Sequence, residues 1–301
     1  MKQFLFTNFL RLLEFFTGKK IVYFPKDRGA KNLTAVKSDF GFWYAGNVLD
    51  MADIAYGVLY NGSVEQDGSR LVVNILKHLL SKKSRLVFYD IGANTGYFGI
   101  LAAHMGLPDK VFTYSFEPVA EFNKIELETL KLNCLENSCR IFNFALGDKS
   151  GEAEIFLAGS GTSLRKDFLG DLKFPARKVE VKLLDEAVRQ EKLQPADFVK
   201  IDVEGHELSV LKGAVETLRN YKPVVWYESA LTIKSSSYSS NEYFATQDFL
   251  RNLGYEIFYC GSSLIPAPRQ DVADGVCMYL ALHRQEHKEL FFMLDKLYAQ
   301  S

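Results

Sequence analysis

Leu86-Val87-Phe88-Tyr89-Asp90-Ile91-Gly92-Ala93-Asn94-Thr95-Gly96 is the stretch from which the fold can be worked out. It begins with four apolar residues, which is the length of a short buried strand, and it ends in a turn that contains two glycines. Just after it, apolar residues recur at the spacing of one helix face: Phe98, Leu101, Ala102 and Met105. The segment therefore predicts a strand, a tight turn and a helix in direct succession.

The same alternation of strand and helix continues along the chain. Further apolar runs predict strands at 111–116, 140–145, 198–201, 223–228, 255–260 and 276–282, with extra strands at 152–157 and 178–183. Helical patterns lie between them, at about 118–137, 208–218 and 243–253. Strands joined by helices need crossover connections, so we expect an α/β fold with a mostly parallel sheet and helices on both faces. Ligands of such sheets bind at the carboxyl ends of the strands.

We expect three parts in the chain: a helical leader or cap over 1–80, the ligand-binding α/β domain over 81–284, and an amphipathic C-terminal helix over 285–301. The aromatic-rich segment 1–16 is interrupted by Arg11 and Glu14 and fits neither a cleaved signal nor a spanning helix. Two interpretations of it stay open, namely a helix packed on the main domain and an interfacial helix that touches a membrane or a second copy. We expect a cytoplasmic protein, either free or peripheral to a membrane.

The composition argues against two classes of partner. The chain has 36 basic and 37 acidic residues, a net charge of −1, so it shows no electrostatic footprint for nucleic acid. No Cys-x-x-Cys pair and no neighbouring histidine cluster accompanies the four cysteines, which argues against a zinc site.

The glycine turn predicts the kind of ligand. Its glycines are not spaced as G-x-G-x-x-G, and the acid Asp90 at its start would repel a phosphate. An acid there suits a ligand with an ammonium and a sulfonium instead. Glu117 ends the next expected strand, 27 residues after Asp90, and a carboxylate at that place can accept hydrogen bonds from both hydroxyls of a ribose. Together the two acids indicate an adenosyl amino acid.

Four motifs of this sequence resemble the motifs of one known family. They are Asp90–Gly96, Phe116-Glu117-Pro118, Ala145-Leu146-Gly147-Asp148 and the segment from Lys200 to Glu207. As a set they are similar to the FkbM-type methyltransferases, over about residues 60 to 230. The resemblance implies a class I, Rossmann-like fold with a seven-stranded sheet and an antiparallel last strand. It also implies S-adenosyl-L-methionine as cofactor and methyl transfer to a hydroxyl oxygen of a sugar, glycolipid or natural product.

The resemblance also implies cofactor residues. Asp90, Gly92, Asn94, Gly96 and Glu117 match the family's cofactor motif, and Ala145 and Leu146 would line the adenine. The candidate cofactor contacts further include the remaining residues of these segments and the acid after the fourth main strand: Ala93, Thr95, Pro118 and Asp202.

Catalysis needs a group that takes the proton of the acceptor hydroxyl. Asp202, His206 and Glu228 follow the ends of expected strands and are the candidate general bases. A hard cation could in principle bind Asp202, Glu204 and His206, but Gly205 argues that the strand turns there, and we expect no metal. Two other functions stay open: a nucleotide-cofactor oxidoreductase on a related sheet, and a non-catalytic module that binds S-adenosylmethionine.

Overall fold

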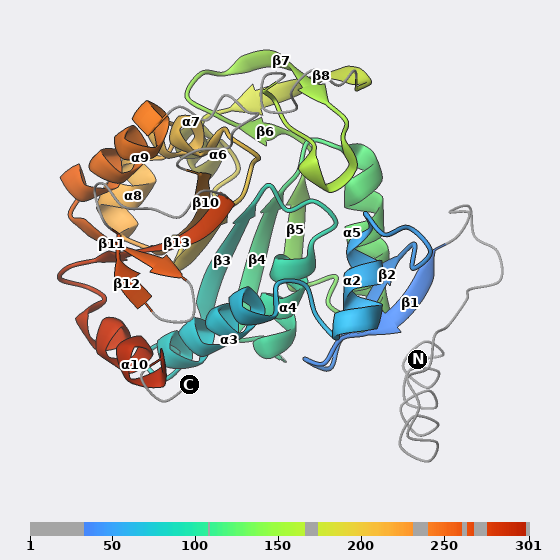
Figure 1. Ribbon diagram of the computed structural model, residues 1–301, viewed down its shortest axis with the longest axis horizontal. Helices are drawn as coiled ribbons and strands as arrows, with labels where there is room; N and C mark the ends of the chain where they lie inside the picture. The colour runs from blue at the N-terminus through green and yellow to red at the C-terminus, as the bar shows by residue number, and fades with distance from the viewer. Residues whose placement is uncertain are drawn as a thin grey trace.

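A computed structural model describes residues 33–107, 109–165, 174–230, 240–260, 264–267 and 276–298. An eight-stranded sheet crosses the middle of this part of the chain in the order β12-β11-β13-β10-β9-β3-β4-β5 (Figure 1). In chain order these strands are β3 (Leu86–Ile91), β4 (Val111–Phe116), β5 (Cys139–Phe142), β9 (Phe198–Ile201), β10 (Val224–Ala230), β11 (Tyr255–Cys260), β12 (Leu264–Pro266) and β13 (Val276–His283).

The strand directions confirm the predicted class I fold. β5, β4, β3, β9 and β10 run parallel, whereas β13 lies antiparallel between β10 and β11. These seven strands are the expected sheet with its antiparallel last strand. The short strand β12 adds an eighth strand at one edge, which the sequence did not predict.

Helices cover both faces of the sheet, and side chains that alternate along each strand fill two separate cores. Phe88 belongs to one core, while its neighbours Val87 and Tyr89 belong to the other. The first core lies under α3 (Gln66–Leu80), α4 (Tyr97–Met105), α5 (Ala120–Asn133) and α10 (Lys288–Tyr298). The second lies under α6 (Leu184–Gln190), α7 (Glu207–Lys212), α8 (Val215–Tyr221) and α9 (Ser240–Asn252).

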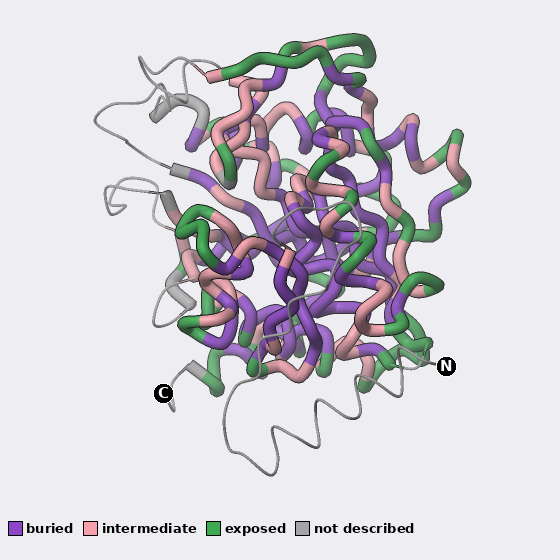
Figure 2. Tube along the Cα trace, turned by 90° about the vertical axis from the view of Figure 1, so that its right-hand side faces the viewer, coloured by how far each residue is buried: buried purple, intermediate pink, exposed green. Residues whose placement is uncertain are grey.

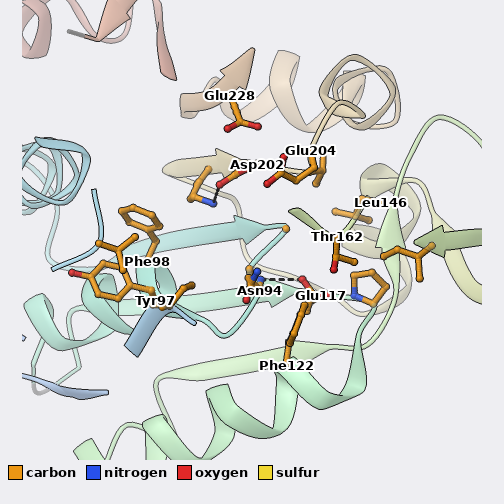
Figure 3. Close-up of a pocket in the computed structure, with 18 of the residues that line it drawn as sticks. Asn94, Tyr97, Phe98, Glu117, Phe122, Leu146, Thr162, Asp202, Glu204 and Glu228 are labelled. Atoms are coloured by element: carbon orange, nitrogen blue, oxygen red, sulfur yellow. Dashed lines mark hydrogen bonds and ion pairs between the residues drawn. The ribbon is translucent and has the colours of Figure 1, made fainter. Parts of the chain in front are cut away.

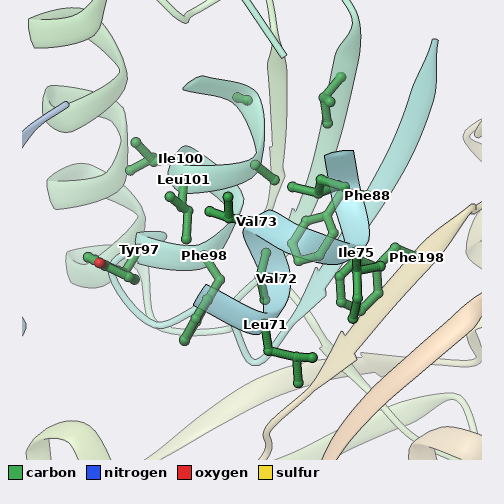
Figure 4. Packing of buried hydrophobic residues seen from close by; sticks show 14 of the residues in the cluster. Leu71, Val72, Val73, Ile75, Phe88, Tyr97, Phe98, Ile100, Leu101 and Phe198 are labelled. Atoms are coloured by element: carbon green, nitrogen blue, oxygen red, sulfur yellow. The ribbon is translucent and has the colours of Figure 1, made fainter. Parts of the chain in front are cut away.

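Figure 4 shows the first core at the point where α3 and α4 meet the sheet. Leu71, Val72 and Ile75 of α3 belong to this core, and Ile75 lies beside Phe88 and Phe198 of the strands in this view. These two rings pack edge to face at 5.1 Å. Seen from the side, buried stretches of the trace run through the centre of the molecule, and the exposed ones lie on its outside (Figure 2). The two cores together extend across the whole sheet, and they fix the strand ends that carry the candidate site.

Residues 34–61 differ from the expected all-helical leader. They form a hairpin of β1 (Thr34–Lys37) and β2 (Trp43–Gly46), followed by α2 (Ile54–Asn61). The hairpin packs on α5, because Asn133 holds both backbone polar groups of Trp43 by hydrogen bonds of 2.6 and 2.8 Å. The division of the chain at residues 80 and 284 stays a prediction. The aromatic segment 1–16 lies outside the described residues.

A second, three-stranded sheet lies beside the carboxyl ends of the main strands, in the order β6-β8-β7 (Figure 1). It consists of β6 (Ala145–Leu146), β7 (Gly151–Phe156) and β8 (Ala176–Lys182). β7 and β8 confirm the two predicted extra strands to within two residues at each end. Within the described ranges, no helix is both long and apolar enough to span a bilayer.

Candidate active site

The turn after β3 has a backbone that requires its two glycines. Gly92 has φ +72°, and a Cβ there would lie 1.8 Å from the carbonyl oxygen of Asp202. Gly96 has φ +79°, and a Cβ there would lie 2.3 Å from the side chain of Glu126. Only glycine reaches such positive φ angles without steric cost and leaves space for both neighbours. The turn therefore packs tightly between the end of β9 and α5.

A cavity of about 310 Å³ opens where β3, β4, β9 and β10 end (Figure 3). It lies at the edge of the sheet where ligands of parallel sheets bind. Of the residues predicted from the sequence, the following line it: Gly92, Ala93, Asn94, Glu117, Pro118, Leu146, Asp202 and Glu228. Residues from five distant parts of the chain thus meet in one cavity.

Glu117 connects the turns after β3 and β4 by hydrogen bonds. Its carboxylate accepts a hydrogen bond of 2.9 Å from the Asn94 amide and one of 2.8 Å from the Val119 amide. Burial raises the pKa of Glu117 to about 8, against the opposing effect of these two hydrogen bonds. Each carboxylate oxygen has a further lone pair, so the group can accept two more donors.

Five predicted residues do not line the cavity, and for three of them the local packing shows why. Asp90 lies below the turn, where it accepts a 2.8 Å hydrogen bond from the Gly99 amide and lies 3.8 Å from Lys200 Nζ. The Thr95 hydroxyl is hydrogen-bonded to the Tyr44 hydroxyl, and Gly96 packs on Glu126. These residues support the turn from beneath.

The other two, Ala145 and His206, also lie outside the cavity. Ala145 packs inside the small sheet, beside the lining residue Leu146. The chain turns sharply after β9, with φ +53° at Glu204 and φ +96° at Gly205. His206 consequently lines a separate depression with Asp148 and Thr246.

Three carboxylates gather in one part of the cavity lining. One oxygen from each of Asp202, Glu204 and Glu228 lies within 4.8 Å of the others, a spacing that could hold a cation. Figure 3 shows Glu228 pointing from β10 toward Asp202 and Glu204. The structure thus places Glu228, and not the expected His206, beside the other two acids.

The acids differ in how their charge is compensated. Lys200 Nζ lies 3.0 Å from Asp202, and Lys200 is only 3% exposed. Burial lowers the pKa of Lys200, but the carboxylates of Asp202 and Asp90 outweigh it and raise the pKa above the ordinary value. Burial and the Asp202 charge raise the pKa of Glu204 to about 8 and that of Glu228 well above its ordinary value. Glu228 Oε2 is buried without a hydrogen-bond partner among the described residues.

Lys200 and Phe122 also line the cavity, although the sequence analysis did not select them as site residues. Lys200 stands two residues before Asp202, so strand alternation could have placed the two on one side of the sheet. No local pattern marks Phe122, which belongs to α5, and Glu65, the residue before α3, lines the cavity as well.

A class I, Rossmann-like sheet whose glycine turn and neighbouring acid share one cavity defines the class of protein: a methyltransferase fold. The sequence profile of the methyltransferase FkbM domain matches residues 90–257, more than half of the chain. The chain belongs to the FkbM methyltransferase family, whose methyl donor is S-adenosylmethionine.

Several solved structures are similar to this chain. An FkbM methyltransferase from Methylobacillus flagellatus is 19% identical with a TM-score of 0.42, and the match covers 65% of this chain and 44% of that one. A SAM-dependent methyltransferase from Agrobacterium tumefaciens is 10% identical with a TM-score of 0.47, with coverage of 87% and 73%. A SAM-dependent O-methyltransferase from Thermotoga maritima is 14% identical with a TM-score of 0.40, with coverage of 84% and 78%. No curated protein matches the chain.

The residues present fit the adenosyl group of S-adenosylmethionine. Glu117 is 6% exposed, faces the cavity and keeps acceptor capacity for the two ribose hydroxyls. Leu146, Ile155 and Leu164 give the adjoining wall an apolar surface of the kind that a flat base requires. Asp202 and Glu204 lie on the side where the ammonium and sulfonium charges would be favoured.

Proposed function

We propose that the chain transfers a methyl group to a hydroxyl oxygen of a sugar, glycolipid or natural-product acceptor, with Glu228 as the general base. The bound cofactor supplies an electrophilic methyl group on a sulfonium, and transfer of this methyl group leaves a neutral sulfide. The protein therefore has two tasks, which are to hold the acceptor oxygen in line with the methyl and to remove its proton.

The observation that carries this proposal is the placement of Glu228. Its Oε2 is buried and has no hydrogen-bond partner among the described residues. One of its carboxylate oxygens lies within 4.8 Å of a carboxylate oxygen of Asp202 and of Glu204. Asp202 is engaged by Lys200 at 3.0 Å, so it suits charge compensation in the site more than proton transfer. Burial makes Glu228 a stronger base than an exposed carboxylate, because it raises the pKa of the group. Glu228 is thus the candidate best able to take a hydroxyl proton.

The test is a methyl-release screen with sugars, lipid-linked glycans and phenols, followed by variants on the best acceptor. We expect Glu228→Gln to lower kcat by about 100-fold, the usual scale of general-base catalysis, with an unchanged Kd for S-adenosylhomocysteine. His206→Ala should stay within about twofold of wild type, because His206 lies outside the cavity.

The pH dependence gives a further criterion. A general base works in its ionised form, and the pKa of Glu228 is raised, so kcat should rise with pH in a range above that in which an exposed glutamate titrates. Glu228→Gln should flatten that rise. A variant that retains both the wild-type kcat and its pH profile would rule out Glu228 as the base.

A further inference from the structure

Lys200 is the one cationic residue that lines the cavity at the strand ends, within the ranges that the structure describes. Five acids line the same cavity: Glu65, Glu117, Asp202, Glu204 and Glu228. The lysine is only 3% exposed, so salt and water screen its charge much less than they screen a surface charge. A single buried cation among several acids therefore influences which of the acids are ionised.

Neighbours on three elements hold the ammonium group of Lys200 in place. Its Nζ donates a 3.0 Å hydrogen bond to Asp202 Oδ2, two residues further along the chain. It lies 3.8 Å from Oδ1 of Asp90, which is the register partner of Lys200 on the neighbouring strand β3. The Phe98 ring of α4 lies with its centroid 5.2 Å from Nζ. Glu65, the residue before α3, adds a further negative charge that favours the charged lysine.

The ion pair with Asp90 does not by itself explain the lysine. Both side chains are almost fully buried, and a buried ion pair contributes little net stability compared with apolar side chains of similar volume. Lys200 moreover makes its shorter contact with Asp202, whose side chain is 22% exposed and lines the cavity. The charge of the lysine thus serves the cavity as well as the core.

Glu228 is the acid whose ionisation matters most for the reaction. One of its carboxylate oxygens lies within 4.8 Å of one from Asp202 and one from Glu204, and like charges at this spacing oppose each other's ionisation. Burial and then the neighbouring acids raise the pKa of Glu228; these acids are Asp202, Glu204 and Glu207. The charge of Lys200 acts in the opposite direction on this pKa. Without the lysine, Glu228 would ionise only at a still higher pH.

We propose that Lys200 is a positioning residue of the methyl-transfer site, which holds Asp202 at the cavity wall and supplies the positive charge that offsets the acids around Glu228. Glu228 takes the proton of the acceptor, and Lys200 acts on the reaction through the carboxylates. This inference rests on the proposed function, since it assigns a further residue to the same reaction.

Lys200→Met tests the inference on the full chain, because it removes the charge and keeps the length of the side chain. With S-adenosylhomocysteine bound, the pKa of Glu228 should rise by about one unit, the lower end of the effect of a nearby opposite charge. Carbon-13 NMR of the glutamate carboxyl groups measures this pKa, and Glu228→Gln identifies the signal. With the acceptor from the methyl-release screen, kcat should fall about tenfold at pH values below that pKa and recover at higher pH, while KM stays within about twofold.

The double variant Asp90→Asn/Lys200→Met separates a role in the site from a role in folding. Lys200→Met alone leaves the buried Asp90 carboxylate without its cation, so the urea midpoint of this variant should fall. The double variant removes that charge as well, and the amide oxygen can still accept from the Gly99 amide, so the midpoint should recover. The raised pKa of Glu228 and the lowered kcat should persist. A double variant with the wild-type kcat and pH profile would show a purely structural lysine and overturn the inference.

Lys83→Met is the matched control, because Lys83 forms an ion pair with Asp197 just before β9 and does not line the cavity. It should change neither the pKa of Glu228 nor kcat. An unchanged Glu228 titration in Lys200→Met protein that still binds S-adenosylhomocysteine would overturn the inference and leave the proposed function standing. Wild-type protein that methylates none of the hydroxyl acceptors would refute the proposed function, and the titration would still show whether Lys200 controls the ionisation of Glu228.

Discussion

Glu126 shows how a single buried acid supports the glycine turn after β3, Gly92–Gly96. It is 0% exposed on α5 and accepts a 2.6 Å hydrogen bond from the Ser115 hydroxyl, and Gly96 packs directly against it. Its other oxygen has no hydrogen-bond partner among the described residues. Burial raises the pKa of Glu126 to about 8, so the folded protein keeps this group largely protonated at neutral pH. A neutral carboxylic acid beneath the turn avoids a further negative charge next to Asp90.

The raised pKa predicts how stability depends on pH. Between the ordinary value of 4.5 and about 8 the folded state binds more protons at Glu126 than the unfolded state does. The free energy of unfolding therefore falls as pH rises through this window, by up to ~1.4 kcal/mol per pH unit for this group. Glu126→Gln removes the titration, so its stability should decline less steeply than that of wild type in urea unfolding between pH 5 and 8.

Glu128→Gln provides the matched control, because Glu128 lies on the same helix but is exposed. It should show the wild-type slope. Equal slopes for all three proteins would mean that Glu126 titrates in the folded state much as it does in the unfolded one.

Among the elements, the hairpin β1–β2 depends on one side chain of α5. Asn133 accepts a hydrogen bond from the Trp43 amide and donates to the Trp43 carbonyl, as well as to the Thr129 carbonyl. The hairpin also places the Tyr44 hydroxyl in hydrogen-bonding contact with the Thr95 hydroxyl of the glycine turn after β3. Asn133 thus connects a helix on the sheet with the backbone that positions the cofactor.

We expect Asn133→Ala to destabilise the protein by about 1–3 kcal/mol, because it leaves half-buried backbone groups of Trp43 unpaired. Hydrogen exchange of the Trp43 amide should accelerate more than exchange in β3 or β4. Asn252→Ala, at the exposed end of α9, should change neither quantity. An unchanged Trp43 exchange rate in Asn133→Ala would show that other contacts hold the hairpin.

The main strands could be predicted from the sequence because each is a mostly apolar run, as in β3, whose six residues are all buried. The elements that were missed are short or depend on a partner: β6 has two residues, β12 has three, and the hairpin β1–β2 is held from α5. Leu130 is buried, but Leu127 is 41% exposed, because the buried face of α5 carries Glu126 and Thr129 under the turn and the hairpin.

At the scale of the whole molecule, the site residues that follow the ends of the main strands could be predicted. Those that other elements bring to the cavity could not. Gly92, Asn94 and Glu117 follow strand ends, so topology alone brought them together. Phe122 reaches the cavity from α5, and no local pattern in the sequence marks it. His206 lies outside the cavity because the chain turns at Glu204 and Gly205, where both φ angles are positive.

The first core joins the parts of the chain that the sequence suggested were separate. Val36 of the hairpin, Phe88 of the sheet and Leu294 of α10 all belong to it. Since the parts share one core, we expect them to unfold together rather than in steps. The C-terminal helix is the most direct place to test this, because it lies at the end of the described chain and packs on α3 and β13.

Leu294→Ala should lower the free energy of unfolding of the whole protein by about 2–5 kcal/mol, since Leu294 is 0% exposed and its loss leaves a cavity. Helix content by circular dichroism, the fluorescence of the two tryptophans and S-adenosylhomocysteine binding should then be lost at one shifted midpoint. Leu297→Ala removes an equal side chain from the same helix, but Leu297 is 42% exposed, so a change below about 1 kcal/mol is expected. If Leu294→Ala instead lost helix content first while cofactor binding persisted, α10 would be an independent appendage, and the boundary predicted at residue 284 would mark a true division of the fold.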